Sequence, residues 1–264
     1  MRHARPHRKT RPDHRAPAAE AECMQINHPN LLGYHGEGFS RVQGWCSDKL
    51  FAVIDMLASC RINKAGGVAE IGIHHGKLFL LLNQLTGAED SSFAIDLFEH
   101  QTLNIDKSGR GNLAIFQENL RKYDAHQGRN VRIIAGDSTD PALDLVATIG
   151  RGTLRFFSVD GGHTVQHLLN DLAIAQQTIT NEGVVIVDDM FHFEWPGVTE
   201  GVVRYMQSFP TLVPVAMGHN KLYMCKMSYH GFYLSLFERC PLAVRRVSFC
   251  GWSVIALSHD RPAG

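Results

Sequence analysis

The stretch AEIGIHHGKLF, residues 69–79, decides which ligand-binding fold the sequence can form. An apolar strand pattern leads into two glycines, and an apolar helical pattern follows them. A phosphate-binding P-loop requires G-x-x-x-x-G-K-[ST]. In this chain Gly72 and Gly76 are one residue too close together, and Leu78 occupies the position of the hydroxyl residue. The stretch is better described as E-x-G-x-x-x-G, a tight turn that brings backbone near a ligand at a strand end.

Apolar, β-branched runs alternate with segments of helical periodicity from about residue 47 onward. This alternation predicts βα units around a mostly parallel sheet. Two short apolar runs separated by His219–Asn220 predict a terminal antiparallel hairpin. The expected fold is α/β, a Rossmann-like doubly wound seven-stranded sheet with five parallel strands, that hairpin, and helices on both faces. The predicted strands are residues 67–73, 92–98, 130–136, 154–160, 183–189, 211–218 and 221–227.

The composition is that of a folded globular protein, with 264 residues, 44% hydrophobic and 20% charged. The 26 basic residues balance the 26 acidic ones, so charge favours neither a nucleic-acid nor a membrane partner. No run approaches the roughly 18 apolar residues of a membrane span. The cysteines include no C-x-x-C pair, which argues against a zinc site or a disulfide scaffold. We therefore expect a cytoplasmic protein.

The two ends of the chain differ from its middle. Residues 1–24 are rich in arginine and proline, which predicts a disordered basic tail. Residues 25–227 contain the alternating pattern and are expected to form the functional domain. Residues 228–264 are a C-terminal extension to which the sequence assigns no role.

Acidic residues stand at or near the ends of the first three predicted strands. Glu70 would repel a phosphate but attract a ligand ammonium. Asp96 can accept hydrogen bonds from both hydroxyls of a ribose, and Asp137 can accept from an adenine amino group. A glycine or acid at one strand end often serves only the turn or a helix cap, whereas acids at three consecutive strand ends favour a ligand site. The predicted cofactor-binding residues are Glu70, Gly72, Gly76, Asp96, Asp137, Ser138 and Asp160.

The fourth and fifth predicted strands also end in carboxylates. Asp160 closes the sequence SVD, and Asp188 and Asp189 close VIVDD. Neighbouring strand ends would bring these three side chains together, where they repel one another unless a cation neutralises them. Oxygen ligands select a hard divalent ion, Mg²⁺ first. We predict that Asp160, Asp188 and Asp189 bind a metal that stabilises a deprotonated hydroxyl of the substrate.

His163, three residues after Asp160, is the candidate catalytic base. Its imidazole can accept a proton near neutral pH. The alternative is a structural role in capping the helix that follows. His192, after the Asp188–Asp189 pair, is the reserve candidate for the base. Trp195 could form a wall of the substrate pocket or a structural turn.

Several motifs resemble the metal-dependent small-molecule O-methyltransferases, a family that includes catechol O-methyltransferase and the macrocin-type and novobiocin-type sugar O-methyltransferases. The resemblance extends from about Trp45 to Met227. Its most specific parts are EIGIHHGK (70–77), FSVDGGHTVQHLLNDLAIA (157–175) and VIVDDM (185–190).

The resemblance implies S-adenosylmethionine as cofactor, in a methyltransferase domain over residues 25–227. It places the metal on the same three aspartates. The catechol enzymes use a lysine as base, so His163 at the matching position is a departure that preserves the role. Gln101, Asn104 and DKSGRG (106–111) resemble a loop that lies near cofactor or substrate in the sugar-modifying relatives.

The first hypothesis is therefore an O-methyltransferase that uses S-adenosylmethionine and a divalent metal such as Mg²⁺. Its acceptor would be a hydroxyl of a small molecule, a sugar or another diol of a natural product. Neither nucleic acid nor membrane is an expected partner, and a homo-oligomer is compatible with the sequence. Two alternatives stay open: a nicotinamide-dependent oxidoreductase, which Glu70 and the terminal hairpin disfavour, and a non-catalytic cofactor-binding module.

Overall fold

The computed structural model describes residues 25–208 and 210–258. The predicted basic tail, residues 1–24, lies outside the described residues. The chain forms one mixed sheet with the strand order β3-β2-β1-β4-β5-β7-β6-β9-β8. The strands are β1 (Gly67–Ile71), β2 (Ser92–Asp96), β3 (Val131–Ala135), β4 (Leu154–Val159), β5 (Ile179–Val187), β6 (Leu212–Gly218), β7 (Lys221–Lys226), β8 (Ala243–Phe249) and β9 (Trp252–Leu257).

The predicted α/β architecture is confirmed, with five parallel strands followed by an antiparallel hairpin. Strands β1 to β5 pair in parallel, β7 runs antiparallel to β5, and β6 runs antiparallel to β7. His219 and Asn220 form the hairpin turn with φ angles of 54° and 64°. Positive φ at both central residues is the signature of the turn that matches the twist of a hairpin.

The predicted number of seven strands is wrong, because residues 228–257 add two strands to the same sheet. Strand β9 pairs in parallel with β6, and β8 pairs antiparallel with β9, so the β6–β7 hairpin does not form the sheet edge. Arg245 and Arg246, which are exposed on the edge strand β8, interrupt the apolar pattern that would predict a strand. Edge strands commonly carry such charges, which oppose pairing with other chains.

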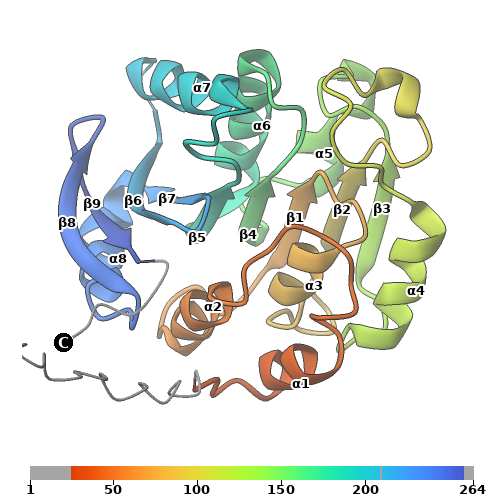
Figure 1. Ribbon diagram of the computed structural model, residues 1–264, viewed down its shortest axis with the longest axis horizontal. Coiled ribbons are helices and arrows are strands. Elements are labelled where there is room, and N and C mark those ends of the chain that lie inside the picture. Colours follow the sequence, from red (N-terminus) through yellow and green to blue (C-terminus); the bar gives the residue numbers. More distant parts are fainter. Residues whose placement is uncertain (1–24, 209, 259–264) are drawn as a thin grey trace, which may run out of the picture.

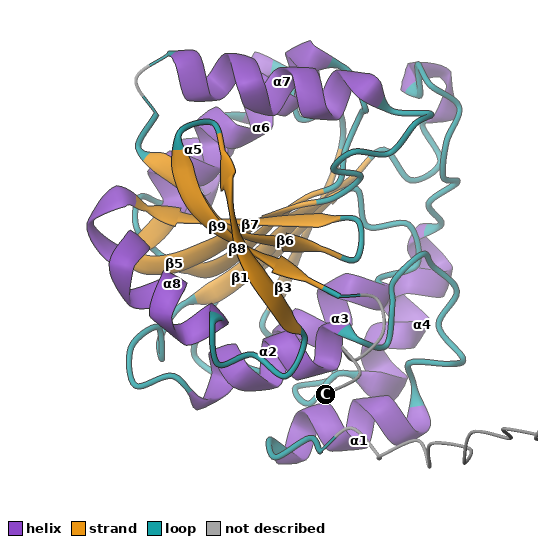
Figure 2. Cartoon of the chain, turned by 60° about the vertical axis from the view of Figure 1, so that its left-hand side comes forward, coloured by secondary structure: helices purple, strands orange, loops and turns teal. Residues whose placement is uncertain are grey.

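Helices cover both faces of the sheet (Figures 1 and 2). One core contains residues of α1, α2, α3, α4 and α8, and the other contains residues of α5, α6 and α7. None of the described helices is long and apolar enough to cross a membrane. The α-helices are α1 (Pro29–Glu37), α2 (Leu50–Ser59), α3 (Lys77–Asn83), α4 (Leu113–Tyr123), α5 (Leu145–Ile149), α6 (Val165–Thr178), α7 (Pro196–Gln207) and α8 (His230–Phe237); short 3₁₀ turns are η1 (Gln101–Leu103), η2 (Pro141–Leu143) and η3 (Met227–Tyr229).

Local sequence signals explain the central elements. Every residue of β1 and β4 is buried, as expected for parallel strands covered on both faces. Helix α4 begins after Asn112, whose side chain accepts the Ile115 N–H at 2.9 Å. Helix α6 begins after Thr164, whose hydroxyl accepts the His167 N–H at 3.3 Å. These caps fix the start of each helix beside the end of the preceding strand or loop.

Helix α6 also contains a buried carboxyl. Asp171 is 1% exposed. Burial raises the pKa of Asp171 from 3.8 to about 6, although hydrogen bonds from Ser138 and Asn170 oppose the shift. The carboxylate form therefore costs folding free energy at neutral pH.

We expect Asp171→Asn to raise the free energy of unfolding at about pH 8 by about 1–3 kcal/mol, since one pKa unit corresponds to about 1.4 kcal/mol. The folded pKa lies above the unfolded one, so the stability that Asp171 contributes is fully present below about pH 4 and is lost as the pH rises through about 6. The advantage of asparagine should therefore shrink toward acid pH. Urea denaturation across this range measures it, with the exposed Asp140→Asn as control. If Asp171→Asn raised the free energy of unfolding equally at about pH 4 and about pH 8, the raised pKa of Asp171 would be contradicted.

Candidate active site

The register of the central strands aligns the residues that follow them. Ile71 of β1 pairs with Ile95 of β2 and with Val159 of β4. Val159 in turn pairs with Val187 of β5. The residues next in sequence are Gly72, Asp96, Asp160 and Asp188. They form a row along the carboxyl edge of the sheet, which is where open α/β sheets bind ligands.

A cavity of about 510 Å³ lies at this edge. Its size falls in the range of small-molecule and cofactor sites. Nine of the predicted site residues line it: Glu70, Gly72, Asp96, Asp137, Ser138, Asp160, His163, Asp188 and Asp189. The structure thus brings the predicted cofactor residues and the predicted metal and base residues to one cavity.

Gly76, also predicted to bind the cofactor, is not among the lining residues. It precedes α3 with φ of 88°, and a Cβ there would lie 2.6 Å from the Phe116 ring. Helix packing therefore explains this glycine. Gly72 differs, because it lines the cavity and a Cβ there would lie 1.8 Å from the Asp160 carbonyl oxygen. Only glycine lets the ends of β1 and β4 approach so closely.

Glu70 is a buried acid, 2% exposed, on β1. Burial, followed by the nearby Asp160 carboxyl, raises the pKa of Glu70 well above its usual range. A cationic group in the cavity would stabilise the ionised form of this side chain.

Asp96 is held in place by backbone donors. Its Oδ2 accepts the His74 N–H at 2.8 Å and its Oδ1 accepts the Phe98 N–H at 2.6 Å. Burial raises the pKa of Asp96 despite these bonds. A Cβ at Gly111 would lie 2.5 Å from Oδ1, so the loop before α4 passes directly over this carboxylate.

Asp137 and Ser138 follow β3. Asp137 Oδ1 accepts the Thr139 N–H and hydroxyl, both at 2.8 Å, and lies 3.6 Å from His167 Nε2. Burial would raise the pKa of Asp137, but these partners outweigh it and lower the pKa. Asp137 is therefore an ionised hydrogen-bond acceptor at neutral pH.

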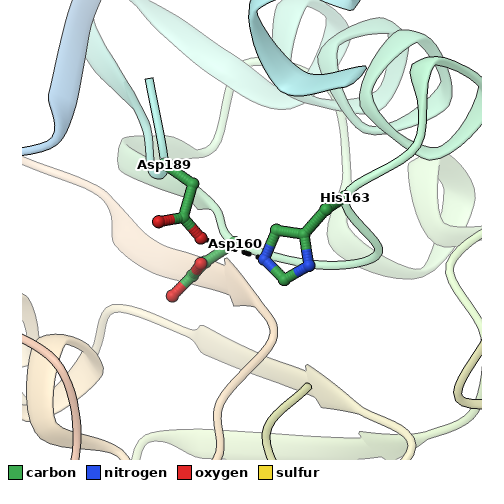
Figure 3. A group of neighbouring side chains, drawn as sticks. All are labelled: Asp160, His163 and Asp189. Carbon is green, nitrogen blue, oxygen red and sulfur yellow. Dashed lines mark ion pairs between the residues drawn. The ribbon is translucent and has the colours of Figure 1, made fainter. Parts of the chain in front are cut away.

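Asp160, His163 and Asp189 form the group shown in Figure 3. One donor atom from each lies within 4.8 Å of the others, a spacing that could hold a metal ion. Burial raises the pKa of Asp160 to about 7, although the Lys221 ammonium opposes the shift. Asp189 has φ of 54° and accepts a hydrogen bond from Asn220 Nδ2 at 2.5 Å.

The His163 ring lies between two carboxylates. Nε2 is 3.0 Å from Asp189 Oδ2, and Nδ1 is 2.7 Å from Asp106 Oδ2. Trp195 stacks on the ring with centroids 4.2 Å apart and planes inclined by 17°. Burial lowers the pKa of His163, but the hydrogen bonds to Asp189 and Asp106 outweigh it and raise the pKa. His163 is therefore built into the cavity wall and does not merely cap α6, whose cap is Thr164.

Asp188 is placed differently from the prediction of three clustered carboxylates. It forms a buried ion pair with Lys221, and its Oδ1 accepts the Asp189 N–H at 2.7 Å. The reason is the register of β5 and β7, in which Val187 pairs with Leu222 and so brings Lys221 beside Asp188. The structure gathers His163, rather than Asp188, with Asp160 and Asp189.

Sequence reasoning did not identify Asp106 or Lys221 as site residues. Asp106 reaches the site from a loop ten residues beyond the end of β2, so its position does not follow from a strand end. The available signal was the polar motif DKSGRG. The loop lines the cavity through Gln101, Asn104, Asp106, Ser108, Gly109 and Gly111.

One protein family model covers the part of the chain that contains the predicted site residues. Residues 69–190 match a family model described as a methyltransferase domain. Residues 69–190 form a methyltransferase domain. The enzyme class expected from the sequence is thereby confirmed, and the alternative of an oxidoreductase gains no support. No curated protein matches the chain in sequence.

Solved structures share the fold of the methyltransferase domain at low identity. The O-methyltransferase NovP is 16% identical with a TM-score of 0.50, over 67% of this chain and 80% of that one. A proposed rRNA methylase from Clostridium thermocellum is 11% identical with a TM-score of 0.50, over 67% and 94%. Because the two carry different descriptions, the shared fold does not define the acceptor.

Proposed function

We propose that the protein transfers a methyl group from S-adenosylmethionine to a hydroxyl oxygen of a small molecule, with the help of a divalent cation. The observation that carries the proposal is the single cavity lined by Glu70, Asp96 and Asp137 together with Asp160, His163 and Asp189. The first set, Glu70, Asp96 and Asp137, suits a nucleoside with an ammonium group. The second set, Asp160, His163 and Asp189, suits an oxygen that must lose a proton.

The first set fits S-adenosylmethionine by its chemistry. Asp96 is fixed to accept from two ribose hydroxyls, Asp137 is an acceptor for an amino group, and Glu70 is a buried acid for the ammonium of the methionine part. The cavity volume is ample for such a ligand. When bound, this cofactor supplies a methyl group already activated on a sulfonium. The protein needs chiefly to align donor and acceptor.

The second set fits a divalent cation. Asp160 and Asp189 supply carboxylate oxygens, the donors that Mg²⁺ prefers, and Asp188 lies beside them. A cation held by Asp160 and Asp189 would bind the acceptor oxygen and stabilise its negative charge. His163 can accept a proton at Nε2 only when Asp189 is not its hydrogen-bond partner. We assign His163 as the base that takes the hydroxyl proton at Nε2.

The mouth of the cavity supports an acceptor with an apolar part. Trp45, Leu103 and Ile105 line the cavity while remaining 75%, 47% and 58% exposed. Exposed large apolar side chains that line a polar cavity suit a ligand with a polar head and an apolar body. A sugar or other diol of a natural product has this character. A homo-oligomeric state and a cytoplasmic location stay predictions from the sequence.

Asp96→Asn tests cofactor binding. We expect the dissociation constant for S-adenosylhomocysteine to rise by about 10-fold or more, because two ribose hydroxyls lose charge-assisted hydrogen bonds. Titration calorimetry measures this, with Asp140→Asn as the matched control of unchanged affinity. An unchanged constant in Asp96→Asn would contradict the ribose role. If the protein binds NADH but does not bind S-adenosylhomocysteine, the result would support the oxidoreductase alternative.

A further inference from the structure

We propose that Asp106 is a positioning residue, which holds the His163 imidazole so that Nε2 faces the reacting hydroxyl. The inference rests on the proposed function of His163 as base. It assigns a specific role to Asp106, in the loop between β2 and α4, whose position does not follow from a strand end.

Asp106 fixes both the backbone and the ring of His163. Its Oδ2 accepts the His163 backbone N–H at 3.1 Å and faces Nδ1 at 2.7 Å. A carboxylate can only accept in the second contact, so it selects the ring form with the proton on Nδ1. Asp189 Oδ2, 3.0 Å from Nε2, can also only accept, so both ring nitrogens carry protons while both contacts hold. When the contact with Asp189 is released and the ring becomes neutral, Asp106 keeps the remaining proton on Nδ1 and the lone pair belongs to Nε2. This is the geometry in which a carboxylate orients a histidine base.

The loop fixes Asp106 in turn. Asp106 Oδ1 accepts the Ser108 N–H at 3.0 Å and the Ser108 hydroxyl at 2.8 Å. Asn104 Nδ2 donates to Gln101 Oε1 at 2.9 Å, to the Ser108 carbonyl at 2.8 Å and to the Gly109 carbonyl at 3.1 Å. These internal bonds close the loop on itself, so it presents the carboxylate in one orientation.

Trp195 restricts the remaining freedom of the ring. Its stack at 4.2 Å opposes tilting of the imidazole, whereas the Asp106 contact opposes rotation within the ring plane. The His163 and Asp106 side chains are 11% and 12% exposed, so water competes little for the bond. A base whose orientation is fixed before the substrate binds loses less entropy in the transition state.

Asparagine cannot replace Asp106 without a mismatch. Both carboxylate oxygens accept from a backbone N–H, that of His163 on one side and that of Ser108 on the other. The amide NH₂ of asparagine would therefore meet a donor in either orientation. Asp106→Asn should break one of the two contacts, and Asp106→Ala should break both.

The kinetic test uses catechol as a probe diol and S-adenosylmethionine with a labelled methyl group. We expect Asp106→Asn and Asp106→Ala to lower kcat by about 10- to 100-fold, with the KM for S-adenosylmethionine and the melting temperature little changed. Lys107→Gln, an exposed charge change in the same loop, should behave as wild type. Combining Asp106→Ala with His163→Gln should cost no more than His163→Gln alone. Wild-type kcat in both Asp106 variants, or an additive loss, would overturn the proposal.

A spectroscopic arm separates this proposal from the proposed function. Nitrogen-15 chemical shifts of the His163 ring, assigned by their loss in His163→Gln, report which nitrogen carries the proton. We expect a protonated Nδ1 in the wild type and, in Asp106→Ala, a shift toward the tautomer protonated at Nε2, because Nε2 still faces Asp189. Unchanged shifts would overturn the role of Asp106 even if methyl transfer is observed. Changed shifts without methyl transfer would support the positioning contact and reject the proposed reaction.

Discussion

Replacement of His163 by glutamine is expected to lower kcat by about 10²- to 10⁴-fold, the range typical of a lost general base. Glutamine has similar polarity and can still hydrogen bond to Asp106 and Asp189, but it cannot take a proton from the acceptor. Affinity for S-adenosylhomocysteine should hardly change, because the cofactor residues Glu70, Asp96 and Asp137 lie on or just after β1, β2 and β3, whereas His163 follows β4. Labelled methyl transfer to catechol and calorimetric titration measure the two quantities.

His192→Gln is the matched comparison, since His192 lines the same cavity but does not belong to the group in Figure 3. We expect it to keep kcat within a few fold of wild type. The opposite pattern, with full kcat in His163→Gln and a large loss in His192→Gln, would transfer the role of base to His192. A fall in melting temperature with unchanged kcat in His163→Gln would indicate a structural role.

Chelation with EDTA is expected to lower methyl transfer by at least about 100-fold, since a cation on an oxyanion is worth several kcal/mol. Cofactor affinity should stay nearly intact, because Glu70, Asp96 and Asp137 bind the cofactor without the cation. Added Mg²⁺ should restore the rate. The direct readout is titration of the protein with Mn²⁺ alone, for which we expect one site that Asp160→Asn weakens.

Asp140→Asn serves as the control for the Mn²⁺ titration, because it changes an exposed aspartate outside the cavity. Full activity in chelator, or Mn²⁺ binding that is equal in wild type and Asp160→Asn, would contradict the proposed cation site. In that case Lys221 would be the fixed positive charge of the site, through its buried pair with Asp188.

Much of the fold followed from local pattern. Buried parallel strands have long apolar runs, and their carboxyl ends carry the polar residues that face a ligand. Gly72, Asp96 and Asp160 could therefore be assigned to one edge from the strand pattern alone. The two C-terminal strands could not, because β8 is an exposed edge strand whose arginines interrupt the alternation.

The site residues that the sequence did not predict, Lys221 and Asp106, owe their positions to strand register and to the conformation of a loop. Lys221 meets Asp188 only because β7 pairs antiparallel with β5 in one particular register. Asp106 meets His163 across 57 residues of sequence, and the bonds of Asn104 and Ser108 determine where the loop places it. Gly76, which the motif assigned to the cofactor, does not line the cavity, and its position beside the Phe116 ring of α4 accounts for a glycine there.

A crystal structure of the protein with S-adenosylhomocysteine and Mn²⁺ tests the central claim most directly. We expect the ribose hydroxyls on Asp96, the amino acid part near Glu70, and an anomalous Mn²⁺ peak between Asp160 and Asp189, on the side of the cavity that holds His163. A nucleoside bound away from Asp96, or a cavity without either ligand at saturating concentrations, would contradict it.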